Sequence, residues 1–252
     1  DFVMFLACIL KHNFHKNKYS VSMFTFKRFS LSDNNSTLKI GTDAVLLGAW
    51  ARVDNAGLVL DIGCGCGVIA LMLAQCSNAS ILGIDIDENS ILEAKQNAKF
   101  SPWSQRVQFQ CIAIQDFQQI SHNKFDCIVC NPPYFEQSLK SPFAHKNLSK
   151  HTDTLSYKEL LQGVNQLLSP QGVFYVILPS QSYDKWLQIC HQEKLYVSRC
   201  CFVKSISHKK HNRVMCAVVK FKTNIKFETL CIREDKDTYS SDYIQLTKEF
   251  YL

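Results

Sequence analysis

The sequence lacks an apolar segment long enough to cross a membrane. The apolar run at residues 2–10 has nine residues, whereas a membrane-spanning helix needs about 20. A secretory signal peptide is not indicated either, because the lysines follow this run and no small-residue cleavage site comes after it. We therefore expect residues 1–22 to be an extension outside the functional protein, which starts at Met23 and acts in the cytoplasm.

The chain also lacks internal repeats and low-complexity tracts. Its 252 residues are 46% apolar, enough for residues 23–252 to form one α/β domain with its own core. Twelve cysteines are present, but several lie in strand-like apolar runs, so we expect reduced thiols instead of a disulfide framework. Cys127 and Cys130 have the spacing of a metal-binding pair, yet in a strand they would point to opposite faces. We therefore expect no metal site.

From residue 58 onward, short β-branched runs alternate with longer segments of helical period. This alternation is typical of a parallel sheet covered by helices on both faces. The expected strands are residues 58–62, 80–85, 106–112, 125–130 and 172–178, and the expected helices are residues 67–75, 88–99, 156–168 and 181–193. Two late strand-like runs, 196–203 and 213–221, have no helix between them and predict an antiparallel hairpin. The sheet would then have seven strands, mostly parallel.

A glycine-rich loop directly follows the first expected strand and opens the first expected helix. Its glycines are Gly63, Gly65 and Gly67, and the absence of β-carbons lets a ligand approach the backbone closely. The dinucleotide pattern G-x-G-x-x-G would need a further glycine where Val68 stands, which disfavours a nicotinamide-binding enzyme. A tight turn without a ligand is the alternative at this point.

Acidic residues follow the expected strands where an adenosine-containing cofactor would bind. Asp85 ends the second strand about 20 positions after the loop, where a carboxylate can accept hydrogen bonds from both ribose hydroxyls. Ile86 would pack on the adenine face, and Asp116 comes shortly after the third expected strand, at the same edge of the sheet. Asp61 fits a role toward the rest of the cofactor, although local backbone amides could equally satisfy it.

The fourth expected strand runs directly into Asn131, Pro132, Pro133 and Tyr134. An exocyclic amino nitrogen is a poor nucleophile, because its lone pair is delocalised. The Asn131 side chain and the Pro132 carbonyl can each accept one of its N–H bonds, while Tyr134 stacks on the planar acceptor. The motif therefore predicts group transfer to an amino nitrogen by positioning, without a strong base. The alternative is a proline turn that merely ends the strand.

With these motifs, the chain resembles the NPPY-type Rossmann-like methyltransferases, and within them the bacterial enzymes that methylate N6 of adenine 37 in tRNA(Val). The similarity runs from about residue 24 to the C-terminus and includes residues 24–27, 39–43, 46–50, 101–103, 131–134, 151–152, 211–214 and 250–252. It implies a class I fold that depends on S-adenosyl-L-methionine. It further implies that Gly41, Thr42 and Asp43 lie near the methionine end of the cofactor, that Asp61, Gly63, Asp85 and Asp116 line the rest, and that Asp116 hydrogen-bonds the adenine amino group. Gly65, Gly67 and Ile86 complete the expected cofactor site.

Two basic segments could contact a polynucleotide. The first contributes Lys146, Lys150 and His151, and the second contributes Lys209, Lys210 and Arg213. Both would rim the acceptor pocket of this fold and suit phosphate contacts in a chain of net charge +6. Solvated loops are the ordinary alternative. The resemblance implies a tRNA substrate, and we expect a monomer without a membrane partner.

Other substrates stay open at this stage. A protein glutamine-N5 methyltransferase needs the same two acceptors, but such enzymes carry a sizeable helical domain before the cofactor loop, and only residues 23–57 precede it here. N6-adenine methylation of DNA and N2-guanine methylation of rRNA are further alternatives. A non-catalytic RNA-binding module is disfavoured, because no binding role requires Asp85, Asn131 and Tyr134 together.

Overall fold

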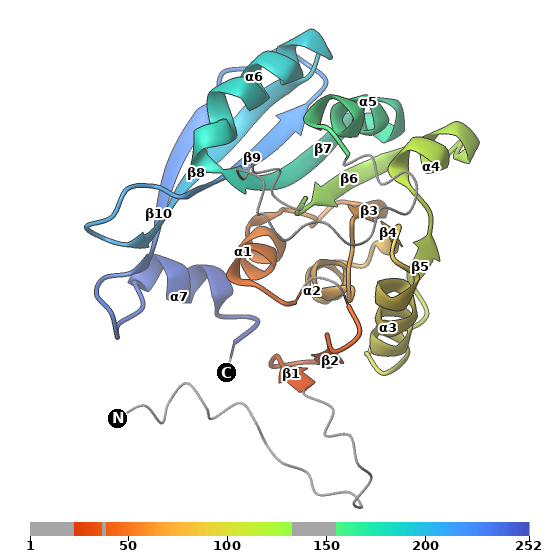
Figure 1. The fold of residues 1–252 in the computed structure, drawn as a ribbon, viewed down its shortest axis with the longest axis horizontal. Coiled ribbons are helices and arrows are strands. Elements are labelled where there is room, and N and C mark those ends of the chain that lie inside the picture. The colour runs from red at the N-terminus through yellow and green to blue at the C-terminus, as the bar shows by residue number, and fades with distance from the viewer. Residues whose placement is uncertain (1–22, 37–38, 133–154, 252) are drawn as a thin grey trace, which may run out of the picture.

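The computed structural model describes residues 23–36, 39–132 and 155–251. One twisted sheet runs through the molecule, with the strand order β10-β8-β9-β7-β6-β3-β4-β5 (Figure 1). In chain order these strands are β3 (Leu58–Ile62), β4 (Ser80–Asp85), β5 (Val107–Cys111), β6 (Phe125–Cys130), β7 (Leu168–Pro179), β8 (Tyr196–Ile206), β9 (Arg213–Val219) and β10 (Lys226–Arg233). A separate two-stranded hairpin, β1 (Met23–Thr25) and β2 (Ser30–Ser32), precedes it.

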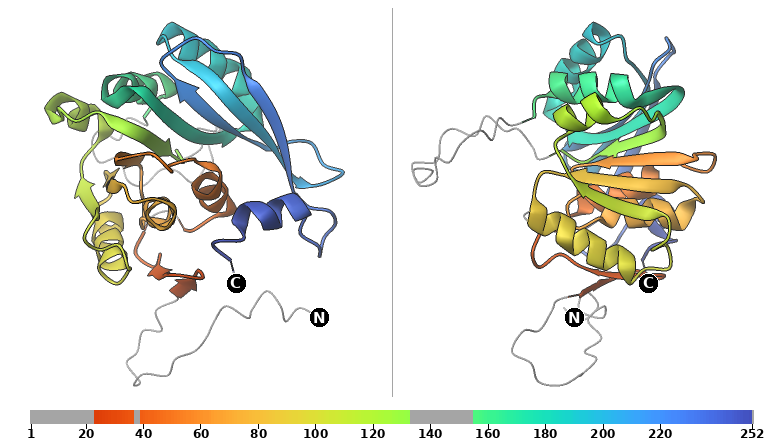
Figure 2. Two further views of the ribbon diagram at one scale, coloured as in Figure 1. Left: turned by 180° about the vertical axis from the view of Figure 1, so that it is seen from behind. Right: turned by 90° about the vertical axis from the view of Figure 1, so that its right-hand side faces the viewer.

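Helices cover both faces of this sheet and bury a hydrophobic core on each side (Figure 2). The first face carries α1 (Thr42–Trp50), α2 (Val68–Cys76), α3 (Glu88–Lys99) and α7 (Ser241–Thr247). The second face carries α4 (Ile114–Ile120), α5 (Tyr157–Leu167) and, after the short 3₁₀ turn η1 (Ser180–Ser182), α6 (Tyr183–Gln192). Cys127 lies in the first core and Cys130 in the second, because residues three apart in a strand point to opposite faces.

The strand order reverses between β3 and β6. From β3 the chain moves outward through β4 to β5, and it then returns to place β6 on the other side of β3. Both β4 and β6 are parallel to β3, with Ile62 paired to Ile84 and to Cys130. In open α/β sheets, ligands bind beside such a reversal, outside the carboxyl ends of the strands. The residues that directly follow Ile62, Ile84 and Cys130 therefore reach this edge at one level. They are Gly63, Asp85 and Asn131.

The expected class I architecture is confirmed, with differences of extent. The strands at 58–62, 80–85 and 125–130 and the helix at 88–99 have the expected bounds. The late hairpin is confirmed as β8 and β9, but β9 lies between β8 and β7. An additional edge strand, β10, pairs in parallel with β8 and makes the sheet eight-stranded instead of seven-stranded. No helix in the described part of the chain is long and apolar enough to span a bilayer.

Candidate active site

The glycine-rich loop between β3 and α2 adopts a backbone that favours glycine. Gly63, Gly65 and Gly67 have φ angles of 68°, 52° and 85°, and a left-handed conformation costs an L-residue about 1–2 kcal/mol. A β-carbon on Gly63 or Gly65 would meet no atom within 4 Å, whereas one on Gly67 would lie 2.6 Å from the Phe109 ring. The first two glycines therefore border open space where a ligand can approach. Gly67 is required for packing against Phe109.

Asp85 fixes the position of this loop from the end of β4. One carboxylate oxygen accepts the Gly65 N–H at 2.9 Å, and the other accepts the Asp87 N–H at 2.9 Å. Each oxygen has a second lone pair, so hydroxyl groups of a ligand can still be accepted. The next side chain, Ile86, is apolar and yet 69% exposed. The pair thus offers a polar and an apolar contact side by side, which fits the predicted ribose and adenine roles.

Asp61 is completely buried on β3, next to the loop. Its Oδ2 accepts the Ala70 N–H at 3.1 Å, while its Oδ1 has no hydrogen-bond partner among the described residues. Burial raises the pKa of this carboxyl to about 7, and the negative charge of Asp85 contributes in the same direction. Local amides thus satisfy only half of the carboxylate. A buried acceptor without a partner is costly unless a ligand or water supplies a donor.

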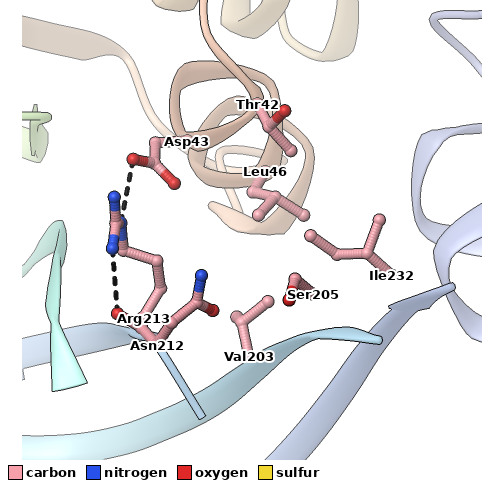
Figure 3. A pocket seen from close by; sticks show the side chains of 8 residues that line it. All are labelled: Thr42, Asp43, Leu46, Val203, Ser205, Asn212, Arg213 and Ile232. Carbon is pink, nitrogen blue, oxygen red and sulfur yellow. Dashed lines mark hydrogen bonds and ion pairs between the residues drawn. The ribbon is translucent and has the colours of Figure 1, made fainter. Parts of the chain in front are cut away.

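The remaining predicted cofactor residues belong to the starts of α1 and α4. Asp116 is exposed in the first turn of α4. Gly41 caps the start of α1 with a φ of −112°, so it has no strained backbone. Thr42 and Asp43 form the first turn of α1 and line a cavity of about 300 Å³ together with Leu46, Val203, Ser205, Asn212, Arg213 and Ile232 (Figure 3).

Arg213 lines this cavity and forms an ion pair with Asp43, which the sequence did not indicate. Its Nε donates to Oδ2 of Asp43 at 3.0 Å, and a terminal nitrogen donates to the Asn212 carbonyl at 3.0 Å (Figure 3). The structure thus joins a residue predicted to contact RNA to one predicted to lie near the cofactor. Lys209 and Lys210, in contrast, are exposed in the turn after β8.

The acceptor motif begins where β6 ends. Asn131 is half-buried and Pro132 is buried, and among the described residues nothing is hydrogen-bonded to the Asn131 side chain. Its amide oxygen is therefore available to a ligand at the reversal of the strand order. The predicted roles of Pro133, Tyr134, Lys146, Lys150 and His151 lie outside the described residues.

Two residues of α3 shape the site and were missed from the sequence. Glu93 is 3% exposed and accepts hydrogen bonds from the Ser32 and Ser36 hydroxyls and from the Ser36 and Asn35 amides. Burial raises the pKa of Glu93, but these bonds lower it more, so its pKa lies below the ordinary value. The carboxylate therefore anchors the segment that leads toward α1.

Asn97, one turn further along α3, completes this anchor. Its Nδ2 donates to the carbonyls of Ser32 at 2.8 Å and Cys66 at 2.9 Å, and its Oδ1 accepts the Ser32 N–H at 2.9 Å. Asn97 thereby ties the N-terminal segment to the glycine-rich loop. In the sequence, the available indication of this anchor was that Glu93 and Asn97, four residues apart, share the side of the helix that also carries Ala94 and Ala98.

A Rossmann-like sheet whose strand ends carry a glycine loop, an acidic residue and an asparagine defines a methyltransferase, and the chain matches the methyltransferase domain family over residues 54–239. It belongs to the tRNA1(Val) (adenine(37)-N6)-methyltransferase family. Its relative of that name from Bacteroides fragilis is 41% identical over 92% of this chain and 99% of the relative. One from a Shewanella species is 38% identical, over 91% and 98%.

A solved structure shares the fold at much lower sequence identity. It is a predicted O-methyltransferase from Agrobacterium tumefaciens, with a TM-score of 0.62 and 14% identity. The match covers 82% of this chain and 96% of that one. At this identity the likeness supports the fold alone.

Proposed function

We propose that the protein transfers a methyl group from S-adenosyl-L-methionine to N6 of adenine 37 in tRNA(Val). One observation carries this proposal: Gly63 and Asn131, which directly follow β3 and β6, and Asp85, the last residue of β4, lie at one level at the ends of three adjacent strands. A cofactor held by Gly63 and Asp85 and an amino group held by Asn131 would meet beside the strand reversal. The names of the relatives supply the substrate.

The glycine-loop region fits this cofactor. Open space beside Gly63 and Gly65 can take a ligand against the backbone, and Asp85 with Ile86 can take its ribose and adenine. Asp61 has a buried oxygen with no hydrogen-bond partner in residues 23–36, 39–132 and 155–251, and a donor from the ligand, or a water bridging to it, would complement this oxygen. Thr42, Asp43 and Asp116 would flank the same ligand. When bound, the cofactor supplies an electrophilic methyl group on a sulfonium sulfur.

Asn131 would act on the amino group by orientation. Its side-chain oxygen accepts one N–H of the adenine amine, and the Pro132 carbonyl accepts the other. With both hydrogens directed toward these acceptors, the nitrogen lone pair points toward the methyl group. Placing the reactants in this way lowers the barrier mainly through proximity and complementary charge. We further propose that Pro133 keeps the motif rigid and Tyr134 stacks on the adenine.

An assay with competing acceptors tests this function. The protein is incubated with labelled cofactor and, separately, with unmodified tRNA(Val), the same transcript carrying guanine at position 37, DNA and a release factor. Digestion and mass spectrometry should find N6-methyladenosine in the first transcript alone. Label on a release-factor glutamine, in DNA, or equally in both transcripts would contradict the assignment.

A further inference from the structure

The hairpin of β8 and β9 has different chemistry on its two faces. Side chains alternate along β8, so Val203 and Ser205 line the cavity that holds Arg213 and Asp43. Phe202 and Lys204 point to the opposite face and line a second cavity of about 460 Å³. We call this second cavity the hairpin pocket; its lining residues are Ser180, Phe202, Lys204, His208, Lys209, Lys210 and His211.

The hairpin pocket is strongly basic. Three of its lining residues are lysines, two are histidines and none is acidic. Within the described part of the chain, none of the three lysines forms an ion pair with a carboxylate, whereas Arg213 on the other face is paired with Asp43. The pocket thus presents uncompensated positive charge, which attracts an anionic partner.

The pocket also has an aromatic wall and a fixed shape. The half-buried ring of Phe202 lies 5.4 Å from the His211 ring and 5.1 Å from the Tyr183 ring, between ring centroids. The Ser180 hydroxyl donates to the His211 carbonyl at 2.8 Å, and the Ser180 backbone N–H donates to the Asn212 backbone carbonyl. These bonds fasten η1 to the turn of the hairpin. In addition, Nε2 of His211 is buried without a hydrogen-bond partner among the described residues.

Its position relates the pocket to the acceptor site. Ser180 directly follows β7, the parallel neighbour of β6, and Val176 of β7 is paired with Cys130. The hairpin pocket and Asn131 therefore lie along the same carboxyl edge of the sheet. Ser180, at one end of the pocket, follows the strand next to β6, whereas Phe202 and Lys204 belong to β8, with β9 and β7 between β8 and β6. Cations beside a solvent-accessible aromatic ring are the combination that binds single-stranded nucleic acid, with phosphate on the cations and the base on the ring. The half-buried Phe202 ring, which lines the pocket, can supply such a surface in part.

We propose that the hairpin pocket holds a second nucleotide of the substrate RNA, outside the reacting adenine. Lys204, Lys209 and Lys210 would contact its phosphates, and its base or ribose would lie against Phe202 and His211. The proposal rests on the proposed function, since it assumes an RNA substrate. It adds a second point of attachment, which would fix the register of the anticodon loop relative to Asn131.

Two variants separate the charge of the pocket from its aromatic wall. K209Q/K210Q should weaken tRNA binding at least about tenfold. The plot of log affinity against log salt should become less steep, its slope falling in magnitude by about 1.5 to 2. Phe202→Leu keeps an apolar side chain but removes the ring, so it should weaken binding at least about fivefold with an unchanged salt slope. Affinities are measured by filter binding between low and moderate salt.

A matched control has the same loss of charge at the other edge of the same strands. Lys194 precedes β8 and Lys222 follows β9, and both are exposed. K194Q/K222Q should bind and methylate tRNA nearly as the unchanged protein does. Cofactor affinity and thermal midpoint, measured for every variant, should stay unchanged and show that the fold is intact.

The outcomes distinguish this proposal from the proposed function. If the unchanged protein methylates tRNA(Val) but K209Q/K210Q and Phe202→Leu behave as K194Q/K222Q does, the hairpin pocket does not bind RNA and only this proposal fails. Absence of tRNA methylation by the unchanged protein would instead contradict the proposed function.

Discussion

The two sides of the carboxyl edge are built in opposite ways. On the glycine-loop side, the carboxylates of Asp61, Asp85 and Glu93 are held by backbone amides and hydroxyls. On the hairpin side, Lys209 and Lys210 are exposed on a turn. A fixed network of short polar side chains suits one small ligand in one geometry. Long exposed cations suit a large polyanion whose contacts are spread over a surface.

Asn131 lies between these two sides, at the end of β6. We propose that this placement divides the work of the site, with cofactor binding on the glycine-loop side and RNA binding on the hairpin side. If the division is correct, a substitution on one side should leave the property of the other side intact. The following changes test how sharp that separation is.

The largest effect is expected for the pH dependence of the unfolding free energy, through Asp61 on the glycine-loop side. Burial raises the pKa of Asp61 from 3.8 to about 7, so the folded state holds this proton more tightly than the unfolded state. Stability should therefore fall as pH rises from about 4 to above 7, by at most about 4 kcal/mol from this group.

Asp61→Asn should remove this fall. Relative to the unchanged protein, the variant should become progressively more stable between pH 5 and pH 8, measured by urea unfolding, while its cofactor affinity decreases. Parallel stability profiles for the two proteins would contradict a raised pKa for Asp61, because they would mean that folding does not change the affinity of this carboxyl for its proton.

Asp85→Ala should affect cofactor binding next most strongly. Hydrogen bonds to a charged acceptor contribute about 1.5–3 kcal/mol, so calorimetry should show a loss of cofactor affinity of about 10- to 150-fold. Affinity for tRNA should change little. Asp126 is the matched control, because its carboxylate also accepts two backbone amides, from Gly57 and Leu58, at the opposite edge of the sheet. Equal losses in Asp85→Ala and Asp126→Ala would refute a specific role.

The smallest effect is expected where the two sides are joined. The Arg213–Asp43 ion pair is partly buried, with 27% and 21% of the two side chains exposed, and an ion pair that solvent still reaches contributes about 1 kcal/mol or less. Asp43→Asn should therefore lower the unfolding free energy by less than about 1 kcal/mol in urea titrations. A loss of several kcal/mol would mean that this pair holds the two sides together.

The sequence predicted the central sheet well because its strands are buried on both faces. The runs ending at Ile62, Asp85 and Cys130 are short and mainly apolar, and helical segments follow them along the chain. The edge strand β10 was missed, because only Leu230 among its residues is buried and no hydrophobic pattern marks it. Helix α1 was missed for the opposite reason, since six of its nine residues are buried and no polar stripe remains along it.

The site shows the same limit. Gly63, Gly65 and Asp85 could be predicted because a loop and the strands beside it fix their positions locally. The anchor formed by Glu93 and the segment at Ser32 and Ser36 could not, because it joins residues about 60 positions apart. The Arg213–Asp43 pair spans 170 positions, so the basic segment alone could not reveal which of its cations face a carboxylate.

The division between the two sides is tested most directly at the residue between them. Asn131→Ala should abolish methyl transfer to tRNA(Val) while leaving cofactor affinity and tRNA affinity close to those of the unchanged protein, measured on the same preparation. This result would assign Asn131 to the reacting amino group alone. Retained turnover, or loss of cofactor binding in parallel with turnover, would contradict the account.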